Sequence, residues 1–280
     1  MEGNNENQLA IKRYYYGDLD YQFGDLRIPN SEGPHPVAVV IHGGYWKSDV
    51  ALDTIADLAK SLTKHGIATW SIEYRRVGQA GGGWPGTLTD AALAIDYLAE
   101  LAKNVNLDLS RVVTIGHSAG GHLALWLAGR HRLPEKSAIN TSNSPFAVQG
   151  AISLAGVADL SLMEDVLSAG EKILKNKFNP VRDLLGGTPL EVPERYEQAS
   201  PIRLLPLGVP QVLIHGALDN IIPIGISQGY KKMADSMNDN VKFVEVSSAE
   251  HFKLIDPKSD AWSIVLEETL ALLQGNVSKF

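Results

Sequence analysis

The segment 116–120 reads Gly-His-Ser-Ala-Gly and places Ser118 at the centre of a G-x-S-x-G pattern. A β-branched run precedes this pattern and a helical pattern follows it, so Ser118 is expected on a tight turn between a strand and a helix. Glycines two residues before and after the serine remove side chains that would collide with the adjoining strand and helix. Such a turn presents the hydroxyl as a nucleophile. The simpler alternative is a serine in an ordinary glycine-rich turn.

A serine nucleophile on this kind of turn is followed along the chain by an acid and then by a base. Asp219 follows the apolar run 211–214, and His251 follows the apolar run 241–246. Both therefore come after the carboxyl ends of expected strands, where the catalytic side chains of open α/β sheets gather. We predict that His251 takes the proton of Ser118 and that Asp219 orients the imidazole ring.

Other residues compete for these two roles. Asp159 follows the expected strand 151–154 and is an alternative to Asp219 as the acid. Four further histidines are expected to have structural or surface roles, namely His42, His65, His122 and His215.

The segment 42–46 reads His-Gly-Gly-Tyr-Trp and follows the expected strand 37–41. Attack on a carbonyl puts negative charge on its oxygen, and a glycine loop can turn its backbone N–H groups toward that charge. We assign this oxyanion hole to the N–H groups of Gly44 and Tyr45, together with that of Ala119 after the nucleophile. A plain glycine turn at a strand end is the alternative.

Four residues near these motifs are candidates for the lining of a substrate pocket: Tyr45, Trp46, Trp84 and His117. For Tyr45 and Trp46, packing beneath the glycine loop is an equally good interpretation. The glycine-rich segment 81–86 lacks the Lys-Ser/Thr of a phosphate-binding loop and is interpreted as a turn before a helix. The sequence holds no cysteine and no H-E-x-x-H spacing, so neither a metal site nor a cofactor is predicted.

The composition predicts a globular protein with a sizeable core. The chain has 280 residues, 44% of them hydrophobic, and a net charge of −7. The negative charge and the lack of long Lys/Arg clusters argue against nucleic acid and against an anionic membrane as partners. Neither a signal-peptide core nor an apolar run of about 18 residues occurs, so a cytoplasmic location is expected. The oligomeric state stays open.

Strand patterns alternate with helical patterns along the chain. Strands are expected at 37–41, 67–72, 112–115, 151–154, 211–214 and 241–246, and helices at 49–65, 87–104, 119–129, 226–237 and 263–273. This alternation predicts one α/β domain with a mainly parallel sheet and helices on both faces. We place this domain at residues 14–280, after a loose tail at 1–13, with a possible extra edge strand within 21–29. Residues 160–206 break the alternation and are predicted to form a small helical cap insertion.

With these motifs the chain resembles the α/β-hydrolase esterases related to hormone-sensitive lipase, and within them the kynurenine formamidase (arylformamidase) group. The H-G-G-x-W loop of that group matches residues 42–46, although many relatives have a third glycine in place of Tyr45. The nucleophile motif matches residues 116–120, and the acid and base motifs match around Asp219 and His251. The resemblance covers residues 21–273 and implies an α/β-hydrolase fold with a Ser-Asp-His triad.

Three functions follow from these expectations. The favoured one is a carboxylesterase that cleaves a small carboxylic ester through an acyl-enzyme. The alternative is an arylformamidase that hydrolyses N-formylkynurenine, as the resemblance implies. A catalytically silent hydrolase fold that binds a ligand is less favoured, because the chain keeps all three triad residues. We expect the fold of residues 160–206 over the pocket to select the acyl and leaving groups.

Overall fold

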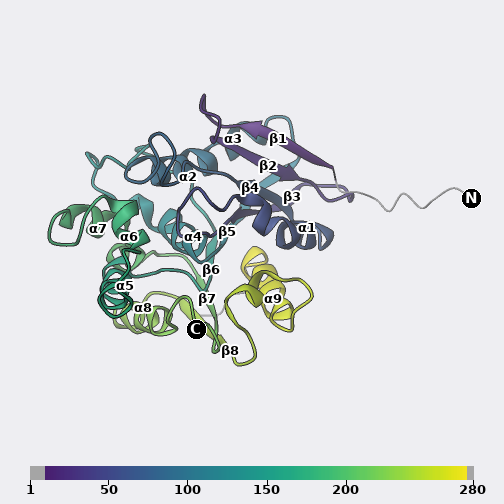
Figure 1. Ribbon diagram of the computed structural model, residues 1–280. Coiled ribbons are helices and arrows are strands. Elements are labelled where there is room, and N and C mark those ends of the chain that lie inside the picture. Colours follow the sequence, from purple (N-terminus) through teal and green to yellow (C-terminus); the bar gives the residue numbers. More distant parts are fainter. Residues whose placement is uncertain (1–9, 276–280) are drawn as a thin grey trace, which may run out of the picture.

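The computed structural model describes residues 10–275 and centres on an eight-stranded twisted sheet (Figure 1). The strand order is β1-β2-β4-β3-β5-β6-β7-β8. The strands are β1 (Ile11–Tyr15), β2 (Phe23–Arg27), β3 (His35–Ile41), β4 (Ala68–Ile72), β5 (Leu107–His117), β6 (Gly150–Leu154), β7 (Gln211–Gly216) and β8 (Val241–Val246). Neighbours from β4 to β8 pair in parallel, whereas β2 is antiparallel to both β1 and β4.

The central strands are apolar on both faces because helices cover both sides of the sheet. In β3, for example, Val39 belongs to one hydrophobic cluster and Val40 to the other, as the two-residue period of a strand requires. This explains why the sequence shows continuous apolar runs there instead of alternation. The prediction of an α/β-hydrolase fold with a mainly parallel sheet is confirmed.

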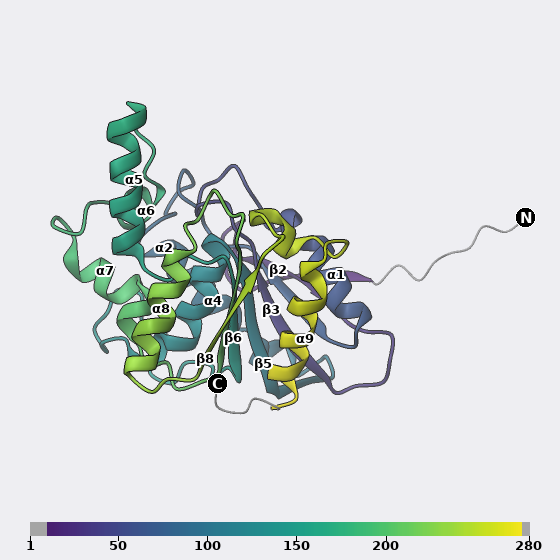
Figure 2. The same cartoon turned by 90° about the horizontal axis from the view of Figure 1, so that it is seen from below.

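The helices form two layers (Figure 2). One layer holds α1 (Ala56–Lys64) and α9 (Ala261–Leu273), and the other contains α2 (Gly86–Asp96), α4 (Ala119–Gly129) and α8 (Gly225–Ser236). Shorter helices are α3 (Leu98–Leu101), η1 (Leu52–Ile55), η2 (Arg130–Arg132) and η4 (His251–Ile255). No helix within residues 10–275 is long and apolar enough to cross a membrane.

The beginning of the chain differs from the prediction. Residues 11–13 were expected in a loose tail but lie in β1, whose Arg13 forms an ion pair with Asp25 of β2 at 2.8 Å. Strand β1 is mostly exposed, so its sequence lacks the apolar pattern that signals a strand. Because β1 takes the outer position, β2 is the second strand and not the edge. Residues 1–9 and 276–280 lie outside the described residues.

Residues 160–206 lie between β6 and β7 and are largely helical. They form α5 (Leu160–Leu174), α6 (Pro180–Leu185), α7 (Pro193–Ala199) and η3 (Pro201–Leu204). Figure 2 shows that α5 projects beyond the other helices, on the side toward which β8 points. The carboxyl ends of the parallel strands lie on that side, so α5 rises beside the edge where the site residues are expected.

Candidate active site

Ser118 stands on a strained turn between β5 and α4. Its backbone has a φ of 55°, a left-handed conformation that non-glycine residues rarely adopt. A Cβ at Gly116 would come within 2.1 Å of the Gly120 carbonyl oxygen, and a Cβ at Gly120 within 2.1 Å of the Ile41 carbonyl oxygen. Both positions therefore require glycine, for the reason that the sequence pattern suggested. The turn holds Ser118 where β5 passes into the first turn of α4.

Asp219 and His251 come together from the ends of β7 and β8. The His251 Nδ1–H donates to Asp219 Oδ2 at 2.6 Å, and both side chains are almost fully buried. The other carboxylate oxygen of Asp219 accepts the backbone N–H groups of Ile221 and Ile222, each at 2.9 Å. Among residues 10–275, neither the Ser118 hydroxyl nor any other group hydrogen-bonds to Nε2 of His251.

Asp219 is held in its charged form. Burial alone would raise its pKa, but the contacts with His215 and His251 and the N–H groups of Ile222 and Ile221 outweigh burial and hold the pKa well below its ordinary value. The carboxylate is therefore an anion at neutral pH. A carboxylate that accepts from one ring nitrogen can fix the tautomer of a histidine.

His215 is a positioning residue that the sequence indicated only as a packed histidine. Its Nε2–H donates to the Ile222 carbonyl at 3.0 Å and lies 3.4 Å from Asp219 Oδ2, while Nδ1 accepts the Ser227 hydroxyl at 2.8 Å. The ring thus ties the turn after β7 to α8 and supports the carboxylate from behind. Its position next to the last residue of β7, four residues before Asp219, is the sequence signal for this contact.

The alternative acid lies elsewhere. The carboxylate of Asp159 accepts the backbone N–H of Leu162 at 3.1 Å and caps α5. The structure therefore brings Asp219, and not Asp159, to His251. A helix N-cap accounts for the side chain of Asp159.

The glycine loop after β3 lies directly against the nucleophile turn. A Cβ at Gly43 would come 2.8 Å from the His117 carbonyl oxygen and 3.2 Å from Cβ of Ser118. Gly44 and Tyr45 follow with φ of 99° and 53°. Within the described part of the chain, no group accepts the backbone N–H of Gly44, Tyr45 or Ala119. Three unpaired amides near one serine can stabilise an oxyanion.

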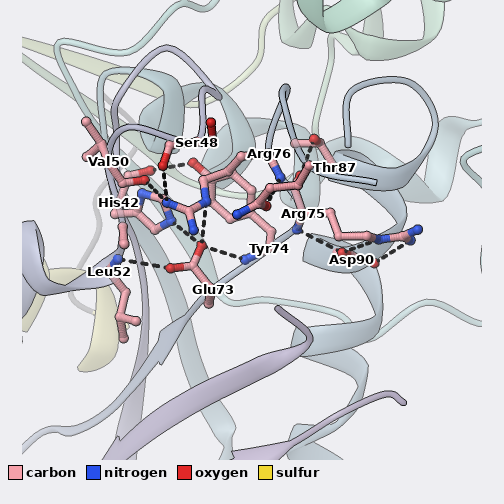
Figure 3. A network of polar contacts seen from close by, with 12 residues as sticks. His42, Ser48, Val50, Leu52, Glu73, Tyr74, Arg75, Arg76, Thr87 and Asp90 are labelled. Atoms are coloured by element: carbon pink, nitrogen blue, oxygen red, sulfur yellow. Dashed lines mark hydrogen bonds and ion pairs between the residues drawn. The ribbon is translucent and has the colours of Figure 1, made fainter. Parts of the chain in front are cut away.

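A buried carboxylate that sequence reasoning missed braces this loop (Figure 3). Glu73 follows β4 and is only 1% exposed. One of its oxygens contacts His42 Nε2 at 2.9 Å and the Tyr74 N–H at 3.0 Å, and the other accepts the Leu52 N–H at 3.1 Å. Arg76 forms an ion pair with the same carboxylate at 3.3 Å. Glu73 therefore connects both ends of the 42–52 loop.

Arg76 and His42 complete the brace. The Arg76 guanidinium donates to the carbonyl oxygens of Ser48 and Val50, and a Cβ at Gly44 would collide with Val50. His42 donates from Nδ1 to the Gly43 carbonyl at 2.8 Å and stacks on Tyr74 at 4.4 Å. The Glu73 pKa is lowered because contacts with His42 and Arg76 outweigh its burial. The signal in the sequence was the run Glu-Tyr-Arg-Arg directly after a buried strand.

The four candidate pocket residues divide into two groups. Trp46 is fully buried beneath the loop and donates to His122 Nδ1 at 3.2 Å, so of the two interpretations the structure favours packing for this residue. His117 is also buried, and its Nε2–H donates to the His251 carbonyl at 3.0 Å. Because burial and the nearby His251 lower the pKa of His117 to about 3, His117 is neutral. It supports the segment that carries the base.

Tyr45 and Trp84 are the two candidates that remain partly exposed. The Tyr45 ring meets Phe178, which follows α5, edge to face at 5.3 Å, and burial together with the Asp219 charge raises the Tyr45 pKa. The Arg195 guanidinium lies over Trp84 at 5.8 Å. Tyr45 therefore connects the glycine loop to the segment 160–206. Within residues 10–275, no group of three or more His, Asp or Glu side chains could hold a metal ion.

The fold is that of the α/β-hydrolases. A truncated carbohydrate esterase from gut microbiota superposes with a TM-score of 0.79 at 21% identity, covering 98% of this chain and 100% of that one. Esterase B from Lactobacillus rhamnosis gives 0.79 at 20% identity, with 98% and 89% covered. Residues 25–234 match the family described as BD-FAE, and the chain belongs to this family.

Curated relatives include esterases and a kynurenine formamidase. A probable isoprenylcysteine alpha-carbonyl methylesterase of Arabidopsis thaliana is 25% identical over 93% of this chain, which spans 55% of that protein. The kynurenine formamidase of Danio rerio is 23% identical over 88% of this chain and 75% of its own length. The resemblance to α/β-hydrolase esterases and kynurenine formamidases is confirmed.

Proposed function

We propose that the protein is a serine hydrolase that cleaves a small carboxylic ester through an acyl-enzyme. The observation that carries the proposal is the 2.6 Å contact between His251 Nδ1 and Asp219 Oδ2, at the sheet edge where Ser118 stands on its strained turn. An ionised carboxylate on one ring nitrogen leaves the other as a base. Membership of a family with esterase relatives supports the same reaction.

In this proposal, His251 Nε2 takes the Ser118 proton while Oγ forms a bond to the ester carbonyl carbon. The carbonyl electrons move to oxygen, where the N–H groups of Gly44, Tyr45 and Ala119 stabilise the charge; each such donor is typically worth about 3 kcal/mol in the transition state. The tetrahedral species collapses, and His251 gives its proton to the departing alcohol. Water then attacks the acyl-enzyme by the same route and releases the acid.

The proposal is tested with a panel of p-nitrophenyl esters whose acyl chains run from acetyl to octanoyl. We expect saturable hydrolysis with a preference for short chains, and loss of turnover in Ser118→Ala. Lack of hydrolysis across the panel and across aryl formamides would contradict the proposal. In that case the protein would be interpreted as a catalytically inactive hydrolase fold that binds a ligand.

An arylformamidase is the second candidate. It is favoured by the Danio rerio kynurenine formamidase, because this chain covers 75% of that protein, a larger share than for the Arabidopsis methylesterase. The same residues would cleave the formamide C–N bond, with His251 protonating the departing amine. A kcat/KM for N-formylkynurenine well above that for p-nitrophenyl acetate would select this candidate, and the reverse ranking would select the ester.

A further inference from the structure

The end of α5 and the residues after it form a distinct surface, which we call the α5 tip and define as residues 172–178. This segment reads Lys-Ile-Leu-Lys-Asn-Lys-Phe, and every residue in it is exposed. Figure 2 shows α5 projecting past the rest of the molecule on the side of the candidate active site. The α5 tip is therefore the part of the fold that an approaching surface on that side would meet.

Only the lower part of α5 is fixed to the domain. Leu160 and Met163 are buried, and Glu164 pairs with Arg182 at 2.7 Å. Toward the end of the helix, Glu171 pairs with Arg182 at 3.2 Å. These contacts hold the base of the helix, and within the α5 tip only Phe178 packs against another part of the described chain, at Tyr45 and Lys47.

The α5 tip exposes large apolar side chains. Ile173 is 78% exposed, Leu174 70% and Phe178 38%. Leu162 and Val166 are also exposed on α5, and their spacing to Ile173 places all three on one helical face. Several exposed apolar residues on a single projecting element indicate an interaction site.

Charge separates this surface from the rest of the chain. Lys172, Lys175 and Lys177 form no ion pair with any residue between 10 and 275, whereas the whole chain has a net charge of −7. The neighbouring acid Glu171 pairs with Arg182, which it shares with Glu164, and Asp165 lies about two turns closer to the base of α5. The α5 tip is thus a basic and apolar projection on an acidic protein.

We propose that the α5 tip docks on the surface of an anionic lipid bilayer. Lysines beside exposed aliphatic and aromatic side chains suit such a surface, since the ammonium groups bind acidic headgroups while the apolar groups enter the interface. The net charge of −7 argued against an anionic membrane as a partner. That value is a sum over the whole chain, whereas the α5 tip is locally positive. A second copy is disfavoured because a two-fold contact would set two basic tips against each other.

Docking would bring the candidate active site to the lipid surface. Phe178 touches Tyr45 of the glycine loop at 5.3 Å, and Lys47 Nζ lies 5.5 Å from the Phe178 ring. When the α5 tip is bound, the glycine loop therefore faces the bilayer. Esters dissolved in the lipid would then have direct access to the candidate active site. That consequence rests on the proposed function, whereas docking itself does not.

The test is co-sedimentation of the full chain with phosphatidylcholine vesicles that contain or lack phosphatidylglycerol. We expect binding to the anionic vesicles only, weakened by salt. Two variants of the α5 tip are K172E/K175E/K177E and I173S/L174S. The affinity of each for the anionic vesicles should fall by at least about tenfold. Activity toward a soluble p-nitrophenyl ester should stay unchanged in both variants. If the unmodified chain had no esterase activity at all, that result would count against the proposed function and not against docking.

Matched controls come from other faces of the molecule. The charge control is K60E/K64E/K258E, which makes the same change in charge at three lysines around another surface depression. The apolar control is L190S/L218S, which removes two other exposed leucines. Both controls should bind vesicles like the unmodified chain. Equal weakening by tip and control variants, or no binding to anionic vesicles, would overturn the proposal. A concentration-dependent dimer that only the tip variants abolish, without vesicle binding, would assign the surface to a second copy instead.

Discussion

The braced glycine loop and the α5 tip lie on the same side of the molecule and differ in almost every physical respect. Behind the loop, Glu73 is buried and contacts four groups from three parts of the chain. At the α5 tip, Lys175 is exposed and pairs with no residue within 10–275. Chemistry on a carbonyl needs donors fixed in advance, whereas docking on a fluid surface needs only charge and apolar area.

The contrast also concerns how each region is held. The loop residues Gly44 and Tyr45 adopt positive φ, a conformation that the surrounding contacts must maintain. The α5 tip is instead a helix end: its one positive φ, at Lys175, is a left-handed C-cap, and the turns below it are anchored through Arg182. Substitutions in the first region should therefore change catalysis, and those in the second should change only where the protein binds.

The largest expected effect concerns the nucleophile. Ser118→Ala should lower kcat toward a soluble ester by roughly 10⁶-fold, because no other group can form the acyl-enzyme. Steady-state kinetics on p-nitrophenyl acetate measure this effect. The tip variant I173S/L174S is the control and should retain full turnover. A Ser118→Ala protein within tenfold of the unmodified rate would remove Ser118 from the mechanism.

The acid should come next. Asp219→Asn should reduce kcat by about 10⁴-fold, since the amide no longer fixes the productive tautomer of His251. Asp159→Asn is the matched control, because it alters a carboxylate that only caps α5. The control should keep its kcat and lose at most about 1 kcal/mol of unfolding free energy. If the two variants exchanged these phenotypes, the acid would have to be reassigned to Asp159.

The brace should have an intermediate effect. Glu73→Gln keeps the shape of the side chain and removes its charge, so the loop amides should lose their alignment. We expect kcat to fall by about 10- to 100-fold, less than the roughly 10²- to 10³-fold loss on removal of an oxyanion donor, because the amides are misaligned and not removed. KM should change less than about twofold.

The control for Glu73 is the neighbouring buried carboxylate in Figure 3. Asp90→Asn disrupts contacts with Arg75 at 2.8 Å but touches no part of the glycine loop. If urea titration gives the two variants an equal decrease in unfolding free energy while only Glu73→Gln lowers kcat, Glu73 supports catalysis by positioning the glycine loop. Equal loss of kcat in both variants would reduce Glu73 to a purely structural role.

The smallest effect is a pH dependence of stability. Burial lowers the pKa of His122 to about 4, whereas the unfolded value is about 6.5. The unfolded chain therefore binds the proton first, and the unfolding free energy should decline as pH falls from about 6.5 to about 4. Urea titrations across this range measure the slope. His117, whose pKa burial lowers to about 3, adds to the slope in the same direction, so His122→Asn should reduce the slope without abolishing it. If the substitution left the slope unchanged, the pH dependence of the unfolding free energy would have to come from groups other than His122.

The positions of the candidate site residues at the ends of strands were predictable because local patterns encode them. Ser118, Asp219 and His251 each follow an apolar strand, and parallel strands bring their carboxyl ends to one edge whatever the details of packing. The central sheet was predictable for the same reason. Gly116 and Gly120 were informative because a Cβ at either would collide with backbone.

Features that depend on distant pairing were not predictable. Strand β1 is exposed and polar, and only its pairing with β2 shows that residues 11–13 are ordered. Glu73 resembles any charged residue after a strand until its partners at His42 and Leu52 are known. Trp46 was equally compatible with a pocket or with packing, and its bond to His122 favours packing. Such contacts join residues that are separated widely in sequence.

The central claim is that Ser118 is the reactive nucleophile, activated by His251 and by the loop amides. Treatment of the intact protein with a p-nitrophenyl alkylphosphonate, followed by mass spectrometry of its peptides, tests this claim most directly. We predict one adduct per chain, on Ser118, absent in Ser118→Ala and formed far more slowly in His251→Ala. An adduct on another residue, or an unmodified Ser118 after prolonged treatment, would contradict the account.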